Sequence, residues 1–340
     1  NTPRLDYSGG ATCPSLLLEP SRSNIVTQSE YMVNFVKGSA TGLTANTGNS
    51  PEGLNNATYF YCSATTTNGY INQGWVGTSG VQYSVSFYAK AKELNLIYIK
   101  NVNDSGAQSY FDLSNGTFTL LSGLDSMSIK DVGDGWYRCT AISTSTSTYI
   151  QWIPILKGNA NEGVYVYGLQ IEQGSYPTSY IPTYGVSQTR AQDNCINSSL
   201  TTSTDFTIFF EAKDFCLING GTGGSYDNLQ FVFSGDGSPY TSNGSFHIYN
   251  NTLYYYDGAT AFGYGDIYNN QTDSKFVIMK RGDKVLAFAN GSKKTEATFP
   301  SGADAKVINW DAINLTQSLQ DGQGDVFGSK YQQLLKFDTA

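Results

Sequence analysis

The sequence predicts an all-β protein made of two tandem antiparallel β-sandwiches. The 340-residue chain contains 36 Gly and 25 Tyr. Windows of Ala, Leu, Glu and Lys long enough for a helix are hard to find. Short β-branched and aromatic runs instead alternate with Gly/Asn turns, which is typical of sandwiches and jelly rolls. A chain of this length favours two domains of roughly 150–200 residues each.

The boundary between the two domains is predicted near the middle of the chain. The run Val164–Glu172 alternates with the period of two of a strand. Its first face carries Tyr165, Tyr167, Leu169 and Ile171. Gly174 ends the pattern, and Pro177 and Pro182 hold the next residues extended. We expect the segment that leads out of the first domain, Tyr176–Asp193, to be stiff; we call it the exit. The predicted parts are an arm at 1–20 packed on the first domain, the first domain at 21–183, a linker at 184–196 and the second domain at 197–340.

Regularly spaced runs predict the strands of both domains. In the first domain we expect strands at 81–91, 94–102, 109–113, 117–121, 136–143, 148–156 and 164–172. With the short strand-like runs in 21–60, these seven make about eight strands, which favours a jelly roll. Asn103–Gly106 and Ser114–Gly116 are hairpin signals. In the second domain we expect strands at 205–212, 229–233, 245–249, 253–256, 275–280, 285–289, 308–310 and 330–337, with an Asn290-Gly291 turn.

Charge and apolar content exclude several classes of partner. The net charge is −8 with a pI near 4.7, and the longest basic run is Lys293-Lys294. Nucleic acid and anionic membrane surfaces are therefore not expected partners. No 18-residue apolar stretch predicts a membrane span. A neutral glycan suits a surface that is poor in charge and rich in aromatic and amide groups. Because Asn1 replaces an initiator Met, we expect a processed product or a fragment.

The cysteines favour reduced thiols. Five are present, at positions 13, 62, 139, 195 and 216, with no CxxC pair. The odd count and wide spacing disfavour a zinc site and a dense disulfide scaffold. Buried thiols are the preferred interpretation, and the pairs Cys62–Cys139 and Cys195–Cys216 stay open.

No catalytic signature is present, so we expect no enzyme. The single histidine, His247, lies in a predicted strand, and the chain has no Gly-x-Ser-x-Gly elbow. Paired carboxylates for glycoside cleavage would have to come from distant loops, since no Glu-x-Asp-x-x-Glu run occurs.

Sugar binding is the sharper hypothesis. Pyranose C–H faces stack on flat aromatic rings, and amide and carboxylate groups bond the hydroxyls. The candidate residues are Tyr59, Tyr61, Trp75, Tyr149, Trp152, Tyr255 and Tyr264. We expect Trp75 and Tyr264 on loops because polar or Gly-rich segments surround them. Trp136 is expected to be structural. For any single one of these residues, the alternative is a scattered surface ring or core filler.

Several ordered phrases resemble one protein family. They are Asn1–Gly10, Cys13–Pro20, Tyr110–Gly116, Gly133–Cys139 and Gly168–Thr183. These phrases resemble the carbohydrate-binding-module-like jelly roll of bacteriophage and prophage structural and tail proteins. The second half resembles a concanavalin-A/laminin-G-like sandwich, with Phe276–Gly291 as its hairpin. The resemblance implies a virion surface module, such as a tail fibre, head fibre or decoration protein, that attaches to host glycans.

The same resemblance sets the expected partners. They are host surface polysaccharide, other virion proteins and further copies of the chain, a homotrimer being favoured, on a virion made in the bacterial host cytoplasm. No cofactor is required; structural Ca²⁺ is the one candidate ion, and no ligand is assigned to it. The alternatives are a purely structural spacer or capsid decoration protein and, less favoured, a polysaccharide depolymerase.

Overall fold

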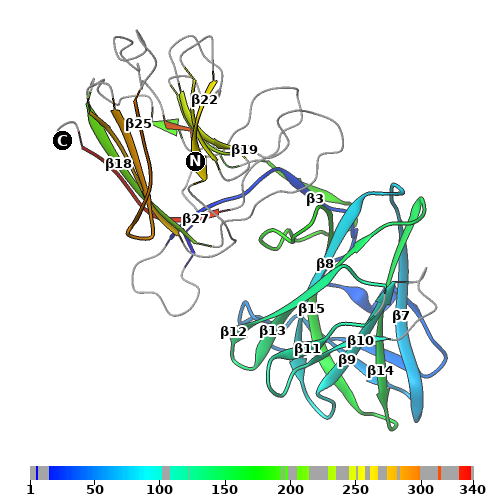
Figure 1. Ribbon diagram of the computed structural model, residues 1–340. Coiled ribbons are helices and arrows are strands. Elements are labelled where there is room, and N and C mark those ends of the chain that lie inside the picture. The colour runs from blue at the N-terminus through cyan, green and yellow to red at the C-terminus, as the bar shows by residue number, and fades with distance from the viewer. Residues whose placement is uncertain are drawn as a thin grey trace. The chain divides into compact units, whose positions relative to one another are not determined.

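The protein is built almost entirely from β-strands, which confirms the predicted all-β class (Figure 1). The computed structural model describes residues 5–6, 15–101, 108–121, 123–191, 193, 196–197, 205–213, 229–234, 245–249, 252–256, 261–266, 274–281, 284–298, 313–314 and 329–337. Within these ranges the only helix is the single 3-10 turn η1 at Met32–Asn34. No helix in the described ranges is both long and apolar enough to cross a membrane.

The chain forms two compact units, and one of them is discontinuous in sequence. Residues 22–190 form one unit, and residues 1–21 join residues 191–340 in the other. We refer to them as the inserted unit and the flanking unit. The chain therefore passes between the units twice, at 21–22 and at 190–191.

Two six-stranded antiparallel sheets form the sandwich of the inserted unit. The first, named here the β8 sheet, has the order β12-β13-β8-β15-β6-β5. Its strands are β5 Thr41–Gly48, β6 Ala57–Cys62, β8 Gln82–Ala91, β12 Ser126–Gly133, β13 Trp136–Thr144 and β15 Gly163–Gln173. The second, the β9 sheet, has the order β11-β10-β9-β14-β7-β4. Its strands are β4 Val36–Lys37, β7 Thr66–Val76, β9 Leu96–Asn101, β10 Ser109–Asp112, β11 Thr117–Thr119 and β14 Tyr149–Gly158.

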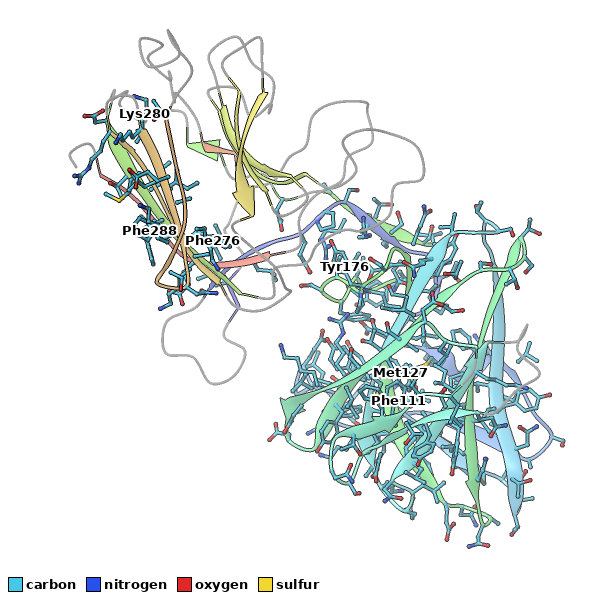
Figure 2. All side chains as sticks on the ribbon, viewed as in Figure 1. Phe111, Met127, Tyr176, Phe276, Lys280 and Phe288 are labelled. Atoms are coloured by element: carbon cyan, nitrogen blue, oxygen red, sulfur yellow. The ribbon has the colours of Figure 1, made fainter. Side chains whose placement is uncertain are left out.

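The main core lies between these two sheets. The β8 sheet contributes Phe60, Val85, Phe87, Cys139 and Ala141, and the β9 sheet contributes Ile71, Ile97, Ile99, Phe111 and Leu156. Figure 2 marks Phe111 and Met127 within this layer of side chains. Phe87 and Phe111 meet edge to face with ring centroids 5.9 Å apart, which ties the two sheets together.

Strand β15 does not alternate evenly, contrary to the sequence-based prediction. A β-bulge lies between Tyr167 and Gln170, and Gly168 has φ +63°. The extra residue reverses the side-chain alternation. Val164 and Val166 point into the main core before the bulge, and Leu169 and Ile171 do so after it. Tyr165 and Tyr167 thus lie on the outer side of the sheet. Glycine suits the bulge because L side chains rarely adopt a positive φ.

The residues after β15 fold back over the outer side of the β8 sheet. The buried Glu172 carboxylate accepts hydrogen bonds from the Thr178 amide (2.8 Å), the Thr178 hydroxyl and Gln170 Nε2 (2.7 Å). Gln170 Oε1 accepts one from the Ile181 amide at 2.6 Å. Arg138 Nη2 donates to the Thr178 carbonyl at 2.6 Å. These side chains supply the backbone partners that an irregular buried segment needs. The exit is therefore fixed to its own unit.

Buried Asn24 extends the same closure to the first strand of the inserted unit. Its Nδ2 donates to the carbonyls of Leu169 and Ile181, and its Oδ1 accepts from the amides of Val26 and Ile171. β3 (Arg22–Asn24) then pairs with β16 (Gln188–Arg190) in an antiparallel ribbon. The entry and the exit of the inserted unit consequently run side by side.

The flanking unit contains two further sheets. The seven-stranded sheet has the order β1-β2-β27-β18-β23-β24-β25. Its strands are β1 Leu5–Asp6, β2 Ser15–Leu18, β18 Phe206–Lys213, β23 Ser274–Arg281, β24 Lys284–Ala289, β25 Ser292–Thr298 and β27 Ser329–Phe337. The six-stranded sheet, β17-β26-β19-β20-β21-β22, comprises β17 Ile196–Asn197, β19 Leu229–Ser234, β20 Ser245–Tyr249, β21 Thr252–Tyr256, β22 Ala261–Asp266 and β26 Ile313–Asn314.

The hairpin at one edge of the seven-stranded sheet agrees with the sequence-based prediction. Asn290 and Gly291 join β24 to β25 with φ of +49° and +77°, as the Asn-Gly signal requires. Phe276, Ile278 and Ala287 are buried, as is Ile208 of β18. The predicted strand at 308–310 and the predicted turn at 103–106 lie outside the described residues.

The N-terminal segment differs from its expected position on the first domain. β2 pairs with β27, with Leu16 opposite Tyr331, and so belongs to the flanking unit. β27 already pairs with β18 along one edge, and a strand edge left bare would expose unpaired backbone groups. The apolar run at 16–18 covers part of the other edge. In the same unit, Glu19 and Asp193 exchange two hydrogen bonds of 2.8 and 3.0 Å.

Cys62 and Cys139 are free and buried, as the composition suggested. Burial raises the pKa of both thiols, and for Cys139 it does so strongly. Neither thiol therefore carries the thiolate character that reactivity requires. The other three cysteines lie outside the described residues.

Candidate functional site

Two of the predicted sugar-binding residues, Tyr59 and Tyr61, form a cluster on the outer side of the β8 sheet. Both rings extend from β6 and stack with centroids 4.8 Å apart and an interplanar angle of 13°. The Lys92 ammonium lies 3.9 Å from the Tyr59 centroid. Tyr61 lies over Gly42 of β5, where a Cβ would come within 2.1 Å of its Cζ. These contacts occupy the ring faces that a sugar would need.

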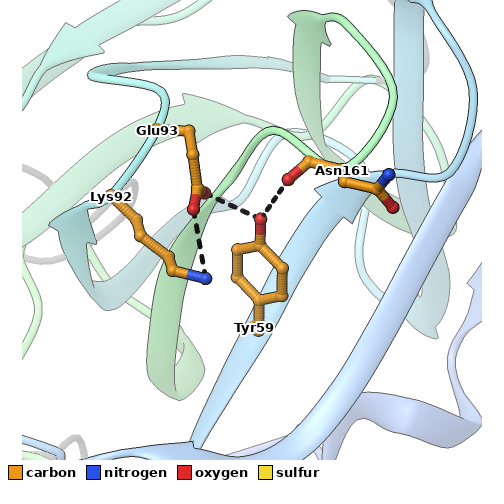
Figure 3. A network of polar contacts seen from close by, with 4 residues as sticks. All are labelled: Tyr59, Lys92, Glu93 and Asn161. Carbon is orange, nitrogen blue, oxygen red and sulfur yellow. Dashed lines mark hydrogen bonds and ion pairs between the residues drawn. The ribbon is translucent and has the colours of Figure 1, made fainter.

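The Tyr59 hydroxyl is also engaged within the protein (Figure 3). It donates to Glu93 Oε2 at 2.7 Å and lies 2.6 Å from the Asn161 carbonyl oxygen. Lys92 pairs with Glu93 at 3.2 Å. Burial and the Glu93 carboxylate raise the pKa of Tyr59. Desolvation opposes ionisation of Glu93, but the hydrogen bonds from Tyr59 and Lys92 outweigh it and lower the Glu93 pKa. The geometry favours a structural role for this cluster.

A second group of tyrosines lies on the outer side of the β9 sheet. Tyr98 of β9 and Tyr110 of β10 are directly opposite in register, with centroids 5.4 Å apart and an interplanar angle of 53°. Both rings are partly exposed. Neither hydroxyl bonds to another described residue. In contrast with Tyr59, these tyrosines keep their hydroxyls available to a ligand.

An apolar floor continues this surface toward β7. Ile155 of β14 pairs with Tyr98 on one side and with Tyr70 on the other. Ile155 is fully buried although it lies opposite the core face, so neighbouring side chains cover it. Tyr70 in turn packs against Gly38, where a Cβ would lie 2.8 Å from its ring. We call Tyr70, Tyr98, Tyr110 and Ile155 the tyrosine face.

Lysines border the tyrosine face. Lys157 Nζ lies 3.8 Å from the Tyr98 ring centroid, and Lys100 follows Tyr98 on the same side of β9. Neither lysine forms an ion pair with a carboxylate among the described residues. Asp112 lies at one end of this side, where its carboxylate accepts bonds from Ser114 and Asn115. Those bonds lower the pKa of Asp112 and hold it in the turn.

Three other predicted residues belong to the β9 sheet. Trp75 lies in β7 rather than on the expected loop, because pairing with β14 overrides the turn tendency of the residues before it. Tyr149 and Trp152 lie in β14, opposite Val76 and Gln73. The side chains of all three fall outside the described part of the structure.

The remaining candidates lie in the flanking unit or in the core. Tyr255 is in β21, opposite Phe262. Tyr264 is in β22 and not on the expected loop, since the Gly-rich segment pairs with β21. Their side chains are outside the described part, so both stay predictions. Trp136 is buried with Tyr167 and donates from Nε1 to the Asn49 carbonyl at 3.1 Å, which is the expected structural role.

Tyr98, Tyr110, Lys100 and Lys157 were not among the binding residues predicted from the sequence. A signal was nevertheless present, because the predicted strand at 94–102 alternates apolar Ile97 and Ile99 with Tyr98 and Lys100. That alternation marks an outward face of aromatic and basic residues. For a metal ion, no group of three or more His, Cys, Asp or Glu side chains gathers among the described residues.

Comparisons with known proteins give structural likeness only. No protein-family model matches the chain. No curated protein matches it either. A Bacteroides ovatus protein to which carbohydrate binding has been ascribed is 11% identical, with 82% of this chain and 78% of that chain covered and a TM-score of 0.29.

Two laminin fragments are similar to the same degree. Domains LG4-5 of mouse laminin α1 are 10% identical over 89% of this chain and 92% of that one, with a TM-score of 0.29. The LG1-3 region of laminin α2 is 11% identical over 79% and 64%, with a TM-score of 0.29. The function therefore has to be argued from the site itself.

Proposed function

We propose that the protein is a non-enzymatic carbohydrate-binding module and that the tyrosine face is its binding surface. One observation carries the proposal: Tyr98 and Tyr110 form a partly exposed pair whose hydroxyls have no partner among the described residues. Across the sheet, the partly exposed Tyr70 continues this surface as a strip on the other side of the buried Ile155. A strip of this kind suits an extended polymer chain better than a single small molecule.

The chemistry of the tyrosine face matches that of a sugar ring. Pyranose rings present C–H groups on their faces and hydroxyls at their edges. Aromatic rings offer flat apolar area to the former, and free tyrosine hydroxyls both donate to and accept from the latter. Tyr149 lies in β14 of the same sheet and stays a predicted sugar-binding residue. Binding of this kind needs no metal and no acid–base pair.

The biological setting that we propose rests on the protein family that the sequence phrases resemble. We propose that it lies on the surface of a phage virion, within a homo-oligomeric fibre or decoration protein, and attaches to host polysaccharide. Structural Ca²⁺ stays part of this proposal, without assigned ligands. The proposed adhesion needs only reversible contacts, each weak, which several copies of the chain would combine.

Affinity electrophoresis against a panel of soluble polysaccharides tests the binding function. We expect retardation of the full chain by at least one polymer and reduced retardation of Tyr110→Ala. The matched control is Tyr59→Phe, which changes a tyrosine on the other sheet and should bind as the unmodified protein does. Equal binding by all three would remove the tyrosine face from the proposal, and release of reducing ends would favour a depolymerase.

A structural spacer or decoration protein is the second candidate, and one surface favours it. The large apolar side chains Tyr31, Leu54, Tyr184 and Val186 are 46%, 60%, 69% and 60% exposed. Glu30 links part of this surface, since it accepts bonds from Tyr184 Oη at 2.9 Å and Asn56 Nδ2 at 3.4 Å. Exposed apolar groups of this kind are typical of subunit contacts. A change of oligomeric state in Val186→Ser with unchanged polysaccharide binding would assign this surface to assembly.

A further inference from the structure

We infer that the polysaccharide bound at the tyrosine face carries carboxylates, as a polymer that contains uronic acid does. The inference rests on the proposed function and makes it more specific. It also departs from the neutral glycan that the overall composition suggested.

The lysines next to Tyr98 are the first reason. Lys157 is exposed, and its ammonium lies over the ring at 3.8 Å from the centroid. Lys100 is two residues further along β9, on the same side of the sheet. Among the described residues no carboxylate forms an ion pair with either of them. A cation–π contact at an exposed site is weak, so Lys157 can leave the ring for an anion.

The contrast with the rest of the chain is the second reason. The chain has a net charge of −8, yet the tyrosine face is bordered by two ammonium groups that have no carboxylate partner in the described part of the chain. Asp112, the carboxylate that the described strands place on this side, is held by Ser114 and Asn115 in the turn after β10. The lysine of the Tyr59 cluster differs, because Lys92 pairs with Glu93. The local charge of the tyrosine face is thus complementary to an anion.

The net charge also limits how dense the negative charge of the ligand can be. A polymer with several sulfates per sugar would be repelled by the overall field and would need a cluster of basic residues. Two separated lysines instead suit sparse charges alternating with sugar faces that stack on tyrosine. One carboxylate per sugar or per repeat fits this spacing.

The experiment compares each polymer with its own carboxyl-reduced form. The probes are polygalacturonate, alginate, hyaluronan and polysialate, with dextran sulfate and neutral dextran alongside, all titrated with the full chain. We expect at least one carboxylated polymer to bind and its reduced form to bind several-fold more weakly. Lys157→Gln combined with Lys100→Gln should lose about five- to tenfold in affinity for the carboxylated polymer and nothing for the reduced one. Raising the salt concentration should weaken the binding of the carboxylated polymer by the unmodified protein and should leave the binding by the double variant unchanged.

A matched variant controls for the change in net charge. Lys90 lies on the outer side of the β8 sheet, opposite Tyr165 and Trp136, and Lys90→Gln should bind as the unmodified protein does. Equal affinity for a polymer and its reduced form would overturn the inference and leave carbohydrate binding intact. Binding to dextran sulfate alone would overturn the choice of carboxylate. Binding to no polysaccharide, neutral or acidic, would overturn the proposed function itself.

Discussion

The two outer faces of the inserted sandwich use similar residues for different ends. On the β8 sheet, the chain closes over its own surface: Glu172 and Gln170 bind the returning backbone, and Lys92 and Glu93 engage Tyr59. On the β9 sheet, Tyr98 and Tyr110 contact each other but bond to no other described residue through their hydroxyls. An aromatic residue on a strand is therefore a poor guide to binding until the partners of its ring and its hydroxyl are known.

The largest expected effect is a loss of stability when the segment after β15 can no longer bond to Glu172 on the outer side of the β8 sheet. Glu172→Ala removes a buried acceptor of three hydrogen bonds. The amide and the hydroxyl of Thr178 lose this acceptor, whereas Gln170 Nε2 keeps its contacts to the carbonyls of Thr178 and Ser179. Since each buried unsatisfied group costs about 1–3 kcal/mol, we expect a loss of roughly 3–5 kcal/mol. Hydrogen exchange of the β8 and β15 amides measures it. Glu172→Gln should lose less, and a loss below ~1 kcal/mol in the alanine variant would mean that the closure is dispensable.

Substitutions in the tyrosine face should change the affinity for polysaccharide and not the stability of the fold. Tyr98→Leu removes the flat ring but keeps an apolar side chain next to Ile155. We expect the affinity for the bound polysaccharide to fall about tenfold, because ring stacking contributes on the order of 1 kcal/mol. Titration calorimetry measures the affinity, and hydrogen exchange should change little. Loss of protection with intact affinity would reverse the roles of the two faces.

Tyr59→Phe tests the contrast between the two outer faces by changing a tyrosine on the β8 sheet. It removes the hydroxyl contacts to Glu93 and to the Asn161 carbonyl and leaves the ring stacked on Tyr61. We expect a destabilisation of about 1 kcal/mol, seen as faster exchange of the β6 and β15 amides. Polysaccharide affinity should be unchanged. A variant with weaker binding and unchanged exchange would return Tyr59 to the candidate sugar-binding residues.

The smallest expected effect is the acid dependence of that cluster. The Glu93 pKa lies below its ordinary value of 4.5 in the folded protein. Because the folded pKa is lowered, its contribution to stability is present above about pH 4.5 and is lost as the pH falls through the folded pKa. The difference stays below ~1 kcal/mol for so exposed a pair. Urea unfolding at pH 3 and pH 6 should show a smaller change in Glu93→Gln than in the unmodified protein.

Much of the fold could be predicted from the sequence because local alternation and turn chemistry decide it. Tyr83, Val85, Phe87 and Ala89 are buried as their spacing implied, and Asn290-Gly291 makes its hairpin. Three features depend on distant partners and could not be predicted in this way. They are the face reversal at Gly168, the pairing of β2 with β27 and the strand conformation around Trp75.

The candidate site was predicted less well for a related reason. Residue type indicated that tyrosines could bind sugar, but it could not tell the engaged Tyr59 from the available Tyr98. That distinction arises from Lys92, Glu93 and Asn161, which come from other parts of the chain. Sugar binding by the predicted residues of the flanking unit, Tyr255 and Tyr264, stays a prediction.

The discontinuous sequence of the flanking unit sets an order for its assembly during synthesis. Leu16 pairs with Tyr331, which lies 331 − 16 = 315 residues later in the chain. The ribosome therefore releases β2 long before its partner strand exists, whereas residues 22–190 contain every strand of their own two sheets. Because contacts so distant in sequence form slowly, the inserted unit should fold first, while the edge of β2 that faces β27 waits for its partner. During that time one edge of the apolar β2 exposes unpaired backbone groups, which a chaperone would protect from pairing with another chain.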